Sequence, residues 1–367
     1  MKILYGKNKK KILKIYIKFL NYFEKRIKLG NFGIAINNKN IKMNKLKVGV
    51  IGTGHLGRVH TMLWMKNTNI EFAGIYDANE NRAEEIAKEF NCKVFKTMQE
   101  TIESCDAVTI SAPTVAHFEI SKLFLEQGKH CFIEKPITAN YNEAVELIEI
   151  SKKNGTIIQV GHVERFNPAI ASLKDMEINP IFIEAHRLSP FRPRAFDVSV
   201  IHDLMIHDID IVLSLIKSKV NKIDANGVAV ITHTPDICNA RLTFENGSVA
   251  NLTASRISAN QMRKMRIFQK DAYFSIDFAK PDVDIFRLYD EGTEPKDYKP
   301  TTMLGSIDAG LKNKNIYFEK PIIPEINAIG EEQQAFVSAI NDKTNVRVTA
   351  EDAAEALRIA EEISNLI

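Results

Sequence analysis

Three polar residues in two segments have the types and spacing needed to move a proton from an alcohol. Lys135 stands in Glu134-Lys135-Pro136, directly after an apolar run that predicts a buried strand. A lysine at the mouth of a strand can polarise a substrate oxygen and stabilise the charge that develops on it. Asp203 and His207 are four residues apart on one face of a predicted helix, where a carboxylate can orient an imidazole as proton acceptor. We therefore predict that Lys135, Asp203 and His207 are catalytic.

Each of these residues also has a structural explanation. Lys135 could be a surface lysine near a helix start, and Asp203 could hydrogen-bond His207 inside a core. A metal site is a further alternative, because His202-Asp203 and His207-Asp208 place two His-Asp dipeptides on one helix. No third cluster of ligands is apparent in the sequence, so we predict no metal.

A glycine pattern, G-x-G-x-x-G at residues 52–57, lies between a strand-like run and a helical pattern. Its glycines permit a tight turn, close approach of the backbone to a pyrophosphate, and close packing of helix on strand. The helix N-terminus would face that anion. Asp77 ends the next predicted strand, where a carboxylate would bind ribose hydroxyls and repel a 2′-phosphate. The pattern predicts an NAD site and disfavours NADP; the alternative is a glycine-rich turn in another α/β protein.

Further ligands are expected at the other strand ends and in an arginine-rich loop. The predicted cofactor-binding residues are Gly52, Thr53, Gly54, His55, Leu56, Gly57, Asp77, Ser111, Ala112, Pro113, Thr114, His117, Glu134 and Lys135. Arginines beside the predicted catalytic helix indicate an anionic substrate, since guanidinium groups match phosphates and carboxylates; a solvated basic loop is the alternative. The predicted substrate-binding residues are Arg165, Asn167, Arg187, Arg192, Arg194, Asp203 and His207.

Strand and helix patterns alternate from Lys45 to Gly161, which predicts a doubly wound parallel sheet of the Rossmann type. Strands are predicted at 46–51, 70–76, 93–95, 107–111, 130–134 and 157–161, and helices at 56–66, 79–90, 114–127 and 140–153. The expected domains are a basic extension at 1–43, a dinucleotide-binding domain at 44–162 and a substrate-binding and oligomerisation domain at 163–367.

The second domain has a different pattern, in which strands follow one another without helices between them. This predicts an α+β domain with a mostly antiparallel sheet, whose second face needs a neighbour if it is apolar; we expect a homodimer or homotetramer. Strands are predicted at 181–188, 225–232, 238–245, 248–257, 264–270, 272–278 and 284–289. Helices are predicted at 167–175, 198–216, 324–341 and 350–366, and the last two could pack back on the first domain.

The net charge of +3 hides a strong asymmetry. Residues 1–43 carry twelve basic residues and one acid, whereas the remainder carries 37 basic and 45 acidic residues, a net of −8. Nucleic-acid binding by the folded body is therefore not supported. The extension is interpreted as a misplaced start or disposable segment, with a membrane-surface helix as the alternative. No apolar run is long enough to span a bilayer, and four widely spaced cysteines indicate reduced thiols in a cytoplasmic protein.

Together these motifs resemble the glucose–fructose oxidoreductase, inositol dehydrogenase and MocA family from Lys45 onward. The resemblance rests on the glycine pattern, Ala112-Pro113-Thr114 with His117, Glu134-Lys135-Pro136, and Asp203-x-x-x-His207-x-x-Asp210. It implies a Rossmann domain, a second domain with a large open sheet, and NAD(P)-linked oxidation or reduction of a sugar, sugar nucleotide or polyol. It also implies that Lys135, Asp203 and His207 are the family's catalytic residues.

Two segments within the chain are more particular: residues 161–168, GHVERFNP, and residues 202–210, HDLMIHDID. They are most similar to the UDP-N-acetylglucosamine 3-dehydrogenases, whose keto product is aminated for modified lipid A. This narrower resemblance implies oxidation of the 3-hydroxyl of UDP-N-acetylglucosamine or a related nucleotide sugar. A dehydrogenase of free polyols or simple sugars, and a non-catalytic NAD-binding regulator, remain as alternatives.

Overall fold

The computed structural model describes residues 45–191, 198–293, 301–308, 310 and 313–367. The predictions for residues 1–43, and those for Arg192 and Arg194, lie outside this range. Residues from Lys45 onward form one compact unit. None of the helices in the described part is both long and apolar enough to cross a bilayer.

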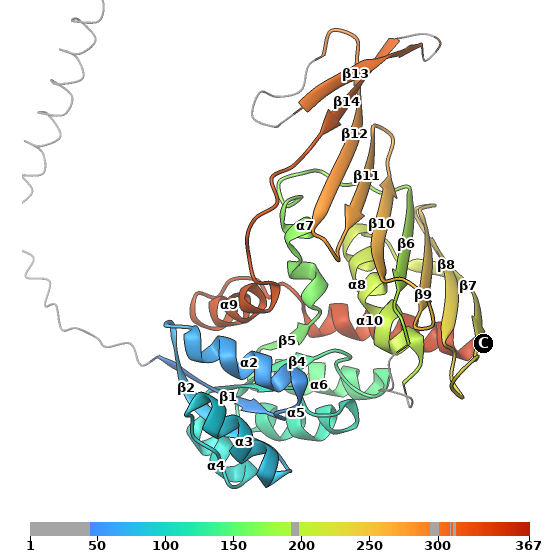
Figure 1. Cartoon of the computed structure of the whole chain (residues 1–367). Coiled ribbons are helices and arrows are strands. Elements are labelled where there is room, and N and C mark those ends of the chain that lie inside the picture. Colours follow the sequence, from blue (N-terminus) through green and yellow to red (C-terminus); the bar gives the residue numbers. More distant parts are fainter. Residues whose placement is uncertain (1–44, 192–197, 294–300, 309, 311–312) are drawn as a thin grey trace, which may run out of the picture. The chain divides into compact units, whose positions relative to one another are not determined.

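The first sheet has five parallel strands in the order β2-β1-β3-β4-β5 (Figure 1). Its strands are β1 (Leu46–Ile51), β2 (Ile70–Tyr76), β3 (Ala107–Ile110), β4 (His130–Glu134) and β5 (Ile158–Gly161). Its helices are α2 (His55–Lys66), α3 (Glu80–Phe90), α4 (Met98–Ser104), α5 (His117–Glu126) and α6 (Tyr141–Asn154). Apolar clusters fill both faces of the sheet, which confirms the predicted Rossmann arrangement.

Three details of this sheet differ from the sequence-based expectation. Residues 93–95 make only a single bridge, Val94 to Ile75, and do not form a strand. Helix α4 was not predicted; Thr97 caps it by accepting a hydrogen bond from the Glu100 backbone N–H. Helix α5 begins at His117, after a 3₁₀ turn at Thr114–Ala116.

The second sheet has nine strands in the order β13-β14-β12-β11-β10-β6-β9-β8-β7 (Figure 1). All neighbouring pairs are antiparallel except β6 and β9, which are parallel. The strands are β6 (Phe182–Leu188), β7 (Val220–Val228), β8 (Ile237–Phe244), β9 (Val249–Ser255), β10 (Met262–Phe268), β11 (Ala272–Asp277), β12 (Asp282–Asp290), β13 (Thr301–Asp308) and β14 (Asn313–Glu319). The predicted mostly antiparallel sheet is therefore confirmed.

Several boundaries in the second sheet are corrected by the structure. Strand β7 lies at 220–228 instead of 225–232, because residues 230–232 donate their backbone N–H groups to the buried Asp236 carboxylate. The pair β13 and β14 was not predicted. The helix expected at 167–175 is the single turn α7 (Pro168–Ala171). The helix expected at 198–216 consists of a π-helical turn, Ile201–Met205, followed by α8 (Ile206–Leu215).

The two C-terminal helices, α9 (Ala328–Asn341) and α10 (Ala350–Asn365), join the two sheets. Phe336 of α9 belongs to the core on one face of the parallel sheet. Helix α10 places Leu357 in the core on the other face, and Ile359 and Ile363 in the core beneath the nine-stranded sheet. A helix with apolar residues around its circumference must be buried on several sides. Both helices therefore contribute apolar side chains to the cores beside the parallel sheet.

Candidate active site

The three glycines in the loop after β1 and the first turn of α2 differ in the space around them, and only Gly54 borders open space. A Cβ on Gly57 would lie 1.9 Å from the Gly52 carbonyl oxygen, and one on Gly52, whose φ is +83°, would lie 2.6 Å from the Ala112 nitrogen. A Cβ on Gly54 would meet no atom within 4 Å. No side chain caps the N-terminus of α2, where Gly54 is the capping residue. This open space beside uncapped backbone N–H groups fits the pyrophosphate of a dinucleotide.

Asp77 is joined to the same loop. Its Oδ2 accepts hydrogen bonds from the Thr53 backbone N–H at 2.6 Å and from the Thr53 hydroxyl at 2.8 Å, while Oδ1 accepts from the Asn79 N–H. The Ser111 hydroxyl donates to the Gly52 carbonyl at 2.7 Å. A carboxylate has about four acceptor positions, so Asp77 retains capacity for a ribose hydroxyl.

His117 lies beneath the site and does not line it. Its ring is buried, with Nδ1 2.9 Å from the Pro136 carbonyl and Nε2 2.9 Å from the Ala112 carbonyl. Burial lowers the pKa of His117, so the neutral ring can donate to only one of these carbonyls at a time. The ring thereby links the ends of β3 and β4. The other predicted cofactor residues of these loops are exposed or half-buried: His55, Leu56, Ala112, Pro113 and Thr114.

Glu134 and Lys135 end β4 in different environments. The buried Glu134 carboxylate lies 2.8 Å from His60 Nε2 and accepts the Lys135 backbone N–H at 3.2 Å. The Lys135 ammonium extends away from this pair to the second sheet's helix. It donates to the Asp203 backbone carbonyl at 2.9 Å and lies 3.4 Å from Asp203 Oδ1. The structure thus brings two of the three predicted catalytic residues into contact.

The predicted hydrogen bond between Asp203 and His207 is absent, which corrects the sequence-based interpretation. The π-helical turn places the Ile206 N–H on the Ile201 carbonyl, five residues back, so side chains four residues apart do not stack as in an α-helix. The Asp203 carboxylate pairs with Lys135 instead. His207 Nδ1 is buried and has no hydrogen-bond partner among the described residues.

His207 is set up as a neutral base. Burial lowers its pKa well below the usual value, and the positive charge of Lys135 lowers it further. A lowered pKa means that the ring becomes protonated only at a pH below its ordinary titration range, so it is neutral and able to accept a proton near pH 7. The Lys135 ammonium, the Asp203 carboxylate and the His207 imidazole can therefore hold a hydroxyl oxygen and remove its proton.

Arg165, Asn167 and Arg187, which were predicted to bind substrate, all have hydrogen-bond partners within the chain. Arg187 is buried in a bidentate pair with Asp208, at 2.9 and 3.0 Å, and also contacts Glu164 at 2.8 Å. Arg165 makes a bidentate pair with Asp210, at 2.7 and 3.0 Å. Asn167 is buried, caps α7 and donates to Glu164. Because buried charges must be paired, these contacts stabilise the fold.

Sequence reasoning missed the polar groups of α9 beneath the site. Gln333 contacts His60 Nδ1 at 3.0 Å, which extends the Glu134–His60 pair. Glu332 is buried, neither carboxylate oxygen has a partner among the described residues, and burial raises its pKa well above the usual value. An unpaired buried polar group costs about 1–3 kcal/mol. The available signal was a pair of polar residues on the same helical face as Phe336.

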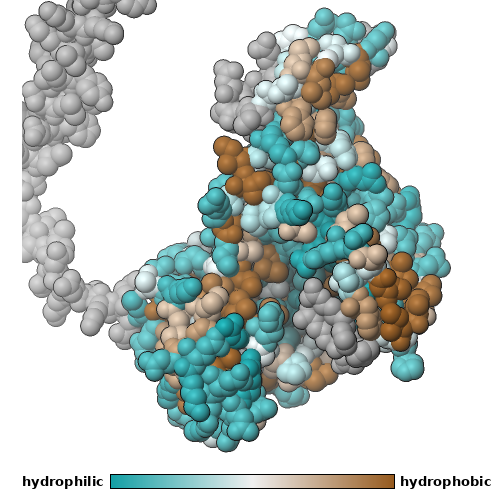
Figure 2. All heavy atoms as spheres, in the orientation of Figure 1, coloured by the Kyte–Doolittle hydropathy of each residue, from teal (hydrophilic) through white to brown (hydrophobic). Residues whose placement is uncertain are grey.

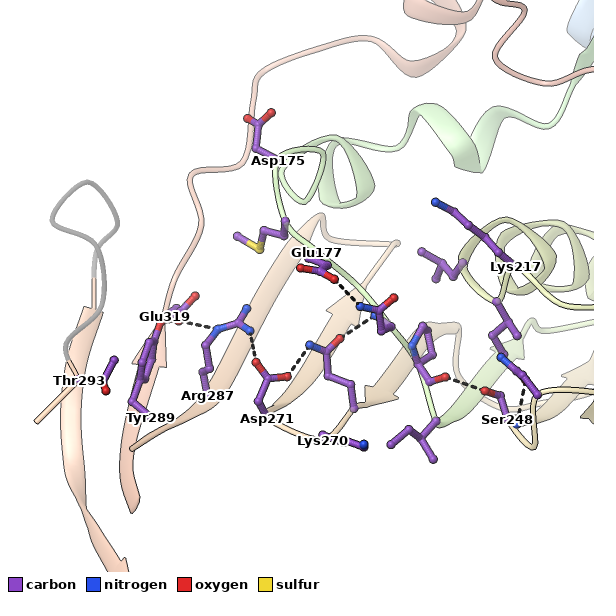
Figure 3. A pocket seen from close by; sticks show the side chains of 18 of the residues that line it. Asp175, Glu177, Lys217, Ser248, Lys270, Asp271, Arg287, Tyr289, Thr293 and Glu319 are labelled. Atoms are coloured by element: carbon purple, nitrogen blue, oxygen red, sulfur yellow. Dashed lines mark hydrogen bonds and ion pairs between the residues drawn. The ribbon is translucent and has the colours of Figure 1, made fainter. Parts of the chain in front are cut away.

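A separate groove lies elsewhere in the described part of the chain. It has a volume of about 1020 Å³ and is lined by the end of α8 and the strands around Arg287. Figure 3 shows its polar side chains joined to one another: Arg287 pairs with Glu319 at 2.9 Å and with Asp271 at 3.0 Å. His207 lies about two helical turns earlier on α8, roughly 12 Å along its axis. This groove is therefore separate from the candidate active site.

Comparison with known proteins agrees with this geometry. Residues 46–162 match the oxidoreductase family with an NAD-binding Rossmann fold, and residues 183–275 match the GFO/IDH/MocA C-terminal domain. The chain belongs to the GFO/IDH/MocA family of NAD-binding oxidoreductases and is an enzyme of the dehydrogenase class.

Among individual relatives, a UDP-N-acetylglucosamine 3-dehydrogenase from Acidithiobacillus ferrooxidans is 40% identical over 245 residues, which cover 66% of this chain and 78% of the relative. A solved structure of the enzyme of that name from the same organism has a TM-score of 0.78 and 33% identity, covering 89% of this chain and 98% of that one. The scyllo-inositol 2-dehydrogenase (NAD(+)) of Bacillus subtilis is 28% identical over 59% of this chain and 68% of its own length.

The free energy of unfolding of an Arg187 variant tests the structural role of this residue. Arg187→Met should lower the free energy of unfolding by about 3–5 kcal/mol, because it leaves the Asp208 and Glu164 carboxylates buried without their partner. Denaturant unfolding at neutral pH measures this. Arg266→Met is the matched control; it breaks an exposed pair with Glu184 and should cost less than about 1 kcal/mol. Equal losses in the two variants would contradict the structural role.

Proposed function

We propose that this enzyme oxidises the 3-hydroxyl of UDP-N-acetylglucosamine or a related nucleotide sugar with NAD. The observation that carries the proposal is the contact of the Lys135 ammonium with Asp203, at 2.9 Å from its carbonyl, on the helix that also holds His207. NAD, when bound, supplies the acceptor for the hydride that leaves the sugar carbon. The chain's own groups supply the rest of the site.

Each of the three side chains has a separate task in this proposal. His207 accepts the hydroxyl proton, because its ring is neutral in the working pH range. Lys135 holds the oxygen from which that proton leaves, and its positive charge stabilises negative charge there. Asp203 fixes the lysine ammonium in place. In the direction of reduction, the same imidazole returns the proton to the oxygen.

The choice of a nucleotide sugar rests on the relative from Acidithiobacillus ferrooxidans. The motifs at residues 161–168 and 202–210 lead to the same expectation. Of the arginines predicted to bind substrate, Arg165 and Arg187 are paired with carboxylates. Arg192 and Arg194 lie outside the described residues, and their contact with the diphosphate stays a prediction.

A substrate panel with matched variants tests the proposal. With NAD, the absorbance of NADH should rise with UDP-N-acetylglucosamine and at least about a hundredfold more slowly, in kcat/KM, with myo-inositol or glucose. Lys135→Ala and His207→Ala should each lower kcat at least about a hundredfold while the Kd for NAD changes less than about twofold. Lys122→Ala, which removes a surface lysine paired with Glu146, is the control and should retain full activity.

Other outcomes of the panel select other functions. A preference for myo-inositol would assign a polyol dehydrogenase. NAD binding without NADH formation on any substrate would assign a regulator. Wild-type turnover in Lys135→Ala or His207→Ala would rule out a catalytic role for that residue.

We infer that NAD is preferred to NADP because Asp77 places a carboxylate beside the loop that would hold the cofactor. Asp77→Asn removes the charge and keeps an acceptor for Thr53. The ratio of kcat/KM for NAD to that for NADP should fall at least about tenfold. Steady-state kinetics with both cofactors measures it, and an unchanged ratio would show that another group makes the selection.

We propose that two or more copies associate through the open face of the nine-stranded sheet. Five aromatic rings cross that face with centroids 4.8–5.9 Å apart: Phe182, Phe268, Tyr273, Phe286 and Phe318. Figure 2 shows further apolar surface on the β13–β14 hairpin, where Met303 and Leu304 are at least half exposed. Such surface favours association. Light scattering should give a dimer or tetramer; a monomer at micromolar concentration would contradict this.

We also propose a cytoplasmic location and a role in supplying a keto sugar nucleotide for lipid A modification. The four cysteines are free thiols, as expected in a reducing compartment, and burial raises the pKa of Cys105 to about 12. The lipid A role rests on the relative's activity alone. Unchanged lipid A after deletion of the gene, or recovery of the protein outside the cytoplasm, would contradict these assignments.

A further inference from the structure

His162 is a fully buried histidine between β5 and the 3₁₀ turn Val163–Phe166. Its backbone is engaged, since its N–H donates to the Val160 carbonyl and its carbonyl accepts from the Arg165 N–H. Neither ring nitrogen has a hydrogen-bond partner among the described residues. Buried polar atoms are nearly always paired, so two orphaned nitrogens on one ring need a specific explanation.

The neighbouring ring is that of His207. The two ring centroids are 6.4 Å apart and the planes meet at 88°. His207 Nδ1 is itself buried and unpartnered, although the residue is partly exposed. No direct hydrogen bond joins the rings. At this centroid separation, nitrogens on facing ring edges would be roughly 4–5 Å apart, a span that one water bridges with two ordinary hydrogen bonds.

A base of this kind needs one partner for its second nitrogen. The partner decides which nitrogen carries the proton and therefore which one is free to accept the substrate proton. A carboxylate often has this task, but Asp203 is held by Lys135. Asp208 and Asp210, the other carboxylates of α8, are held by Arg187 and Arg165. His162 is the polar group whose ring packs against His207 and whose nitrogens remain unpaired.

We propose that His162 is a positioning residue for His207. One buried water accepts the Nδ1 proton of His207 and donates to a ring nitrogen of His162, which leaves His207 Nε2 unprotonated and available to the substrate hydroxyl. When the hydroxyl O–H bond breaks, the proton forms a bond to Nε2, and the water keeps its bond to Nδ1. The proposal rests on the proposed function of His207 as base.

Charged groups near both rings contribute to their pKa values, but none of them is a hydrogen-bond partner of the three orphaned nitrogens. Burial is the main cause of the lowered pKa values of His207 and His162. The charged groups around the two rings are Glu134 and Lys135 at the end of β4, Arg165 on the 3₁₀ turn, Arg187 on β6, Asp203 on the π-helical turn, Asp210 on α8 and Arg263 on β10.

The decisive measurement is the tautomer of His207 in the full-length protein, from ¹⁵N-histidine NMR with His207→Gln for assignment. The wild type should carry the proton on Nδ1 near neutral pH. His162→Gln should keep this tautomer, because an amide can bond the same water. His162→Phe should give a mixture. His130→Gln removes another largely buried histidine, whose Nδ1 accepts the Ile157 N–H, and should leave His207 unchanged.

Kinetics give a second readout. In His162→Phe, kcat should fall at least about tenfold and the acid limb of its pH profile should move to lower pH, with the KM for NAD within about twofold. His162→Gln should stay within about threefold of wild type, with its acid limb unmoved. A purely structural role would affect both variants alike.

The proposal is overturned by a wild-type His207 protonated on Nε2, or by a His207 tautomer and kcat in His162→Phe equal to wild type. Equal losses in the Gln and Phe variants would also overturn it. If His162→Phe does not fold, the wild-type tautomer and His162→Gln still decide. The NMR result needs no turnover, so failure of the substrate panel leaves it independent.

Discussion

The position of helix α8, which carries the proposed base, depends on a set of largely buried arginine–carboxylate pairs. Arg187 on β6 holds Asp208 of α8 and Glu164 of the turn after β5, and Arg165 of that turn holds Asp210. These groups are mostly buried, so breaking one pair leaves a charge in a largely desolvated site without its bidentate partner. The bidentate geometry of these arginine–carboxylate pairs also fixes how the paired side chains are oriented. They fasten α8 to the carboxyl end of the parallel sheet, where ligands of such sheets bind.

The proposed reacting groups come from the end of β4 and from the residues around the start of α8. Lys135 comes from the end of β4, and its ammonium reaches Asp203 just before α8 begins. His207 precedes Asp208, so the residue that is tied to Arg187 directly follows the proposed base. The π-helical turn then separates the two predicted partners Asp203 and His207. The carboxylate serves the lysine, and the imidazole is left to a different neighbour.

The sequence predicted the elements that carry strong local signals. Gly52, Gly54 and Gly57 have the distinct steric environments that their pattern requires, and the alternation of strands and helices predicted the order of the parallel sheet's elements along the chain. Tertiary pairing could not be predicted. An arginine that binds phosphate and an arginine that pairs with a carboxylate look the same in a sequence. Only the structure shows that Arg187 and Arg165 form ion pairs with carboxylates that lie far from them along the chain. The π-helical turn and the β13–β14 hairpin depend likewise on contacts that periodicity does not contain.

The pairing of Asp203 with Lys135 explains how the lysine cation and the proposed base His207 can lie close to each other. Burial makes proton uptake by the His207 imidazole harder, and the nearby Lys135 ammonium acts in the same direction, so the pKa of His207 lies well below its usual value. If Asp203 were bonded to the ring, it would favour the charged imidazole and leave the lysine uncompensated. With Asp203 on Lys135 instead, the local charge is balanced before a substrate arrives and the ring stays neutral. A neutral partner such as His162 then suits His207 better than a carboxylate, because it can orient the ring without stabilising the protonated ring beforehand.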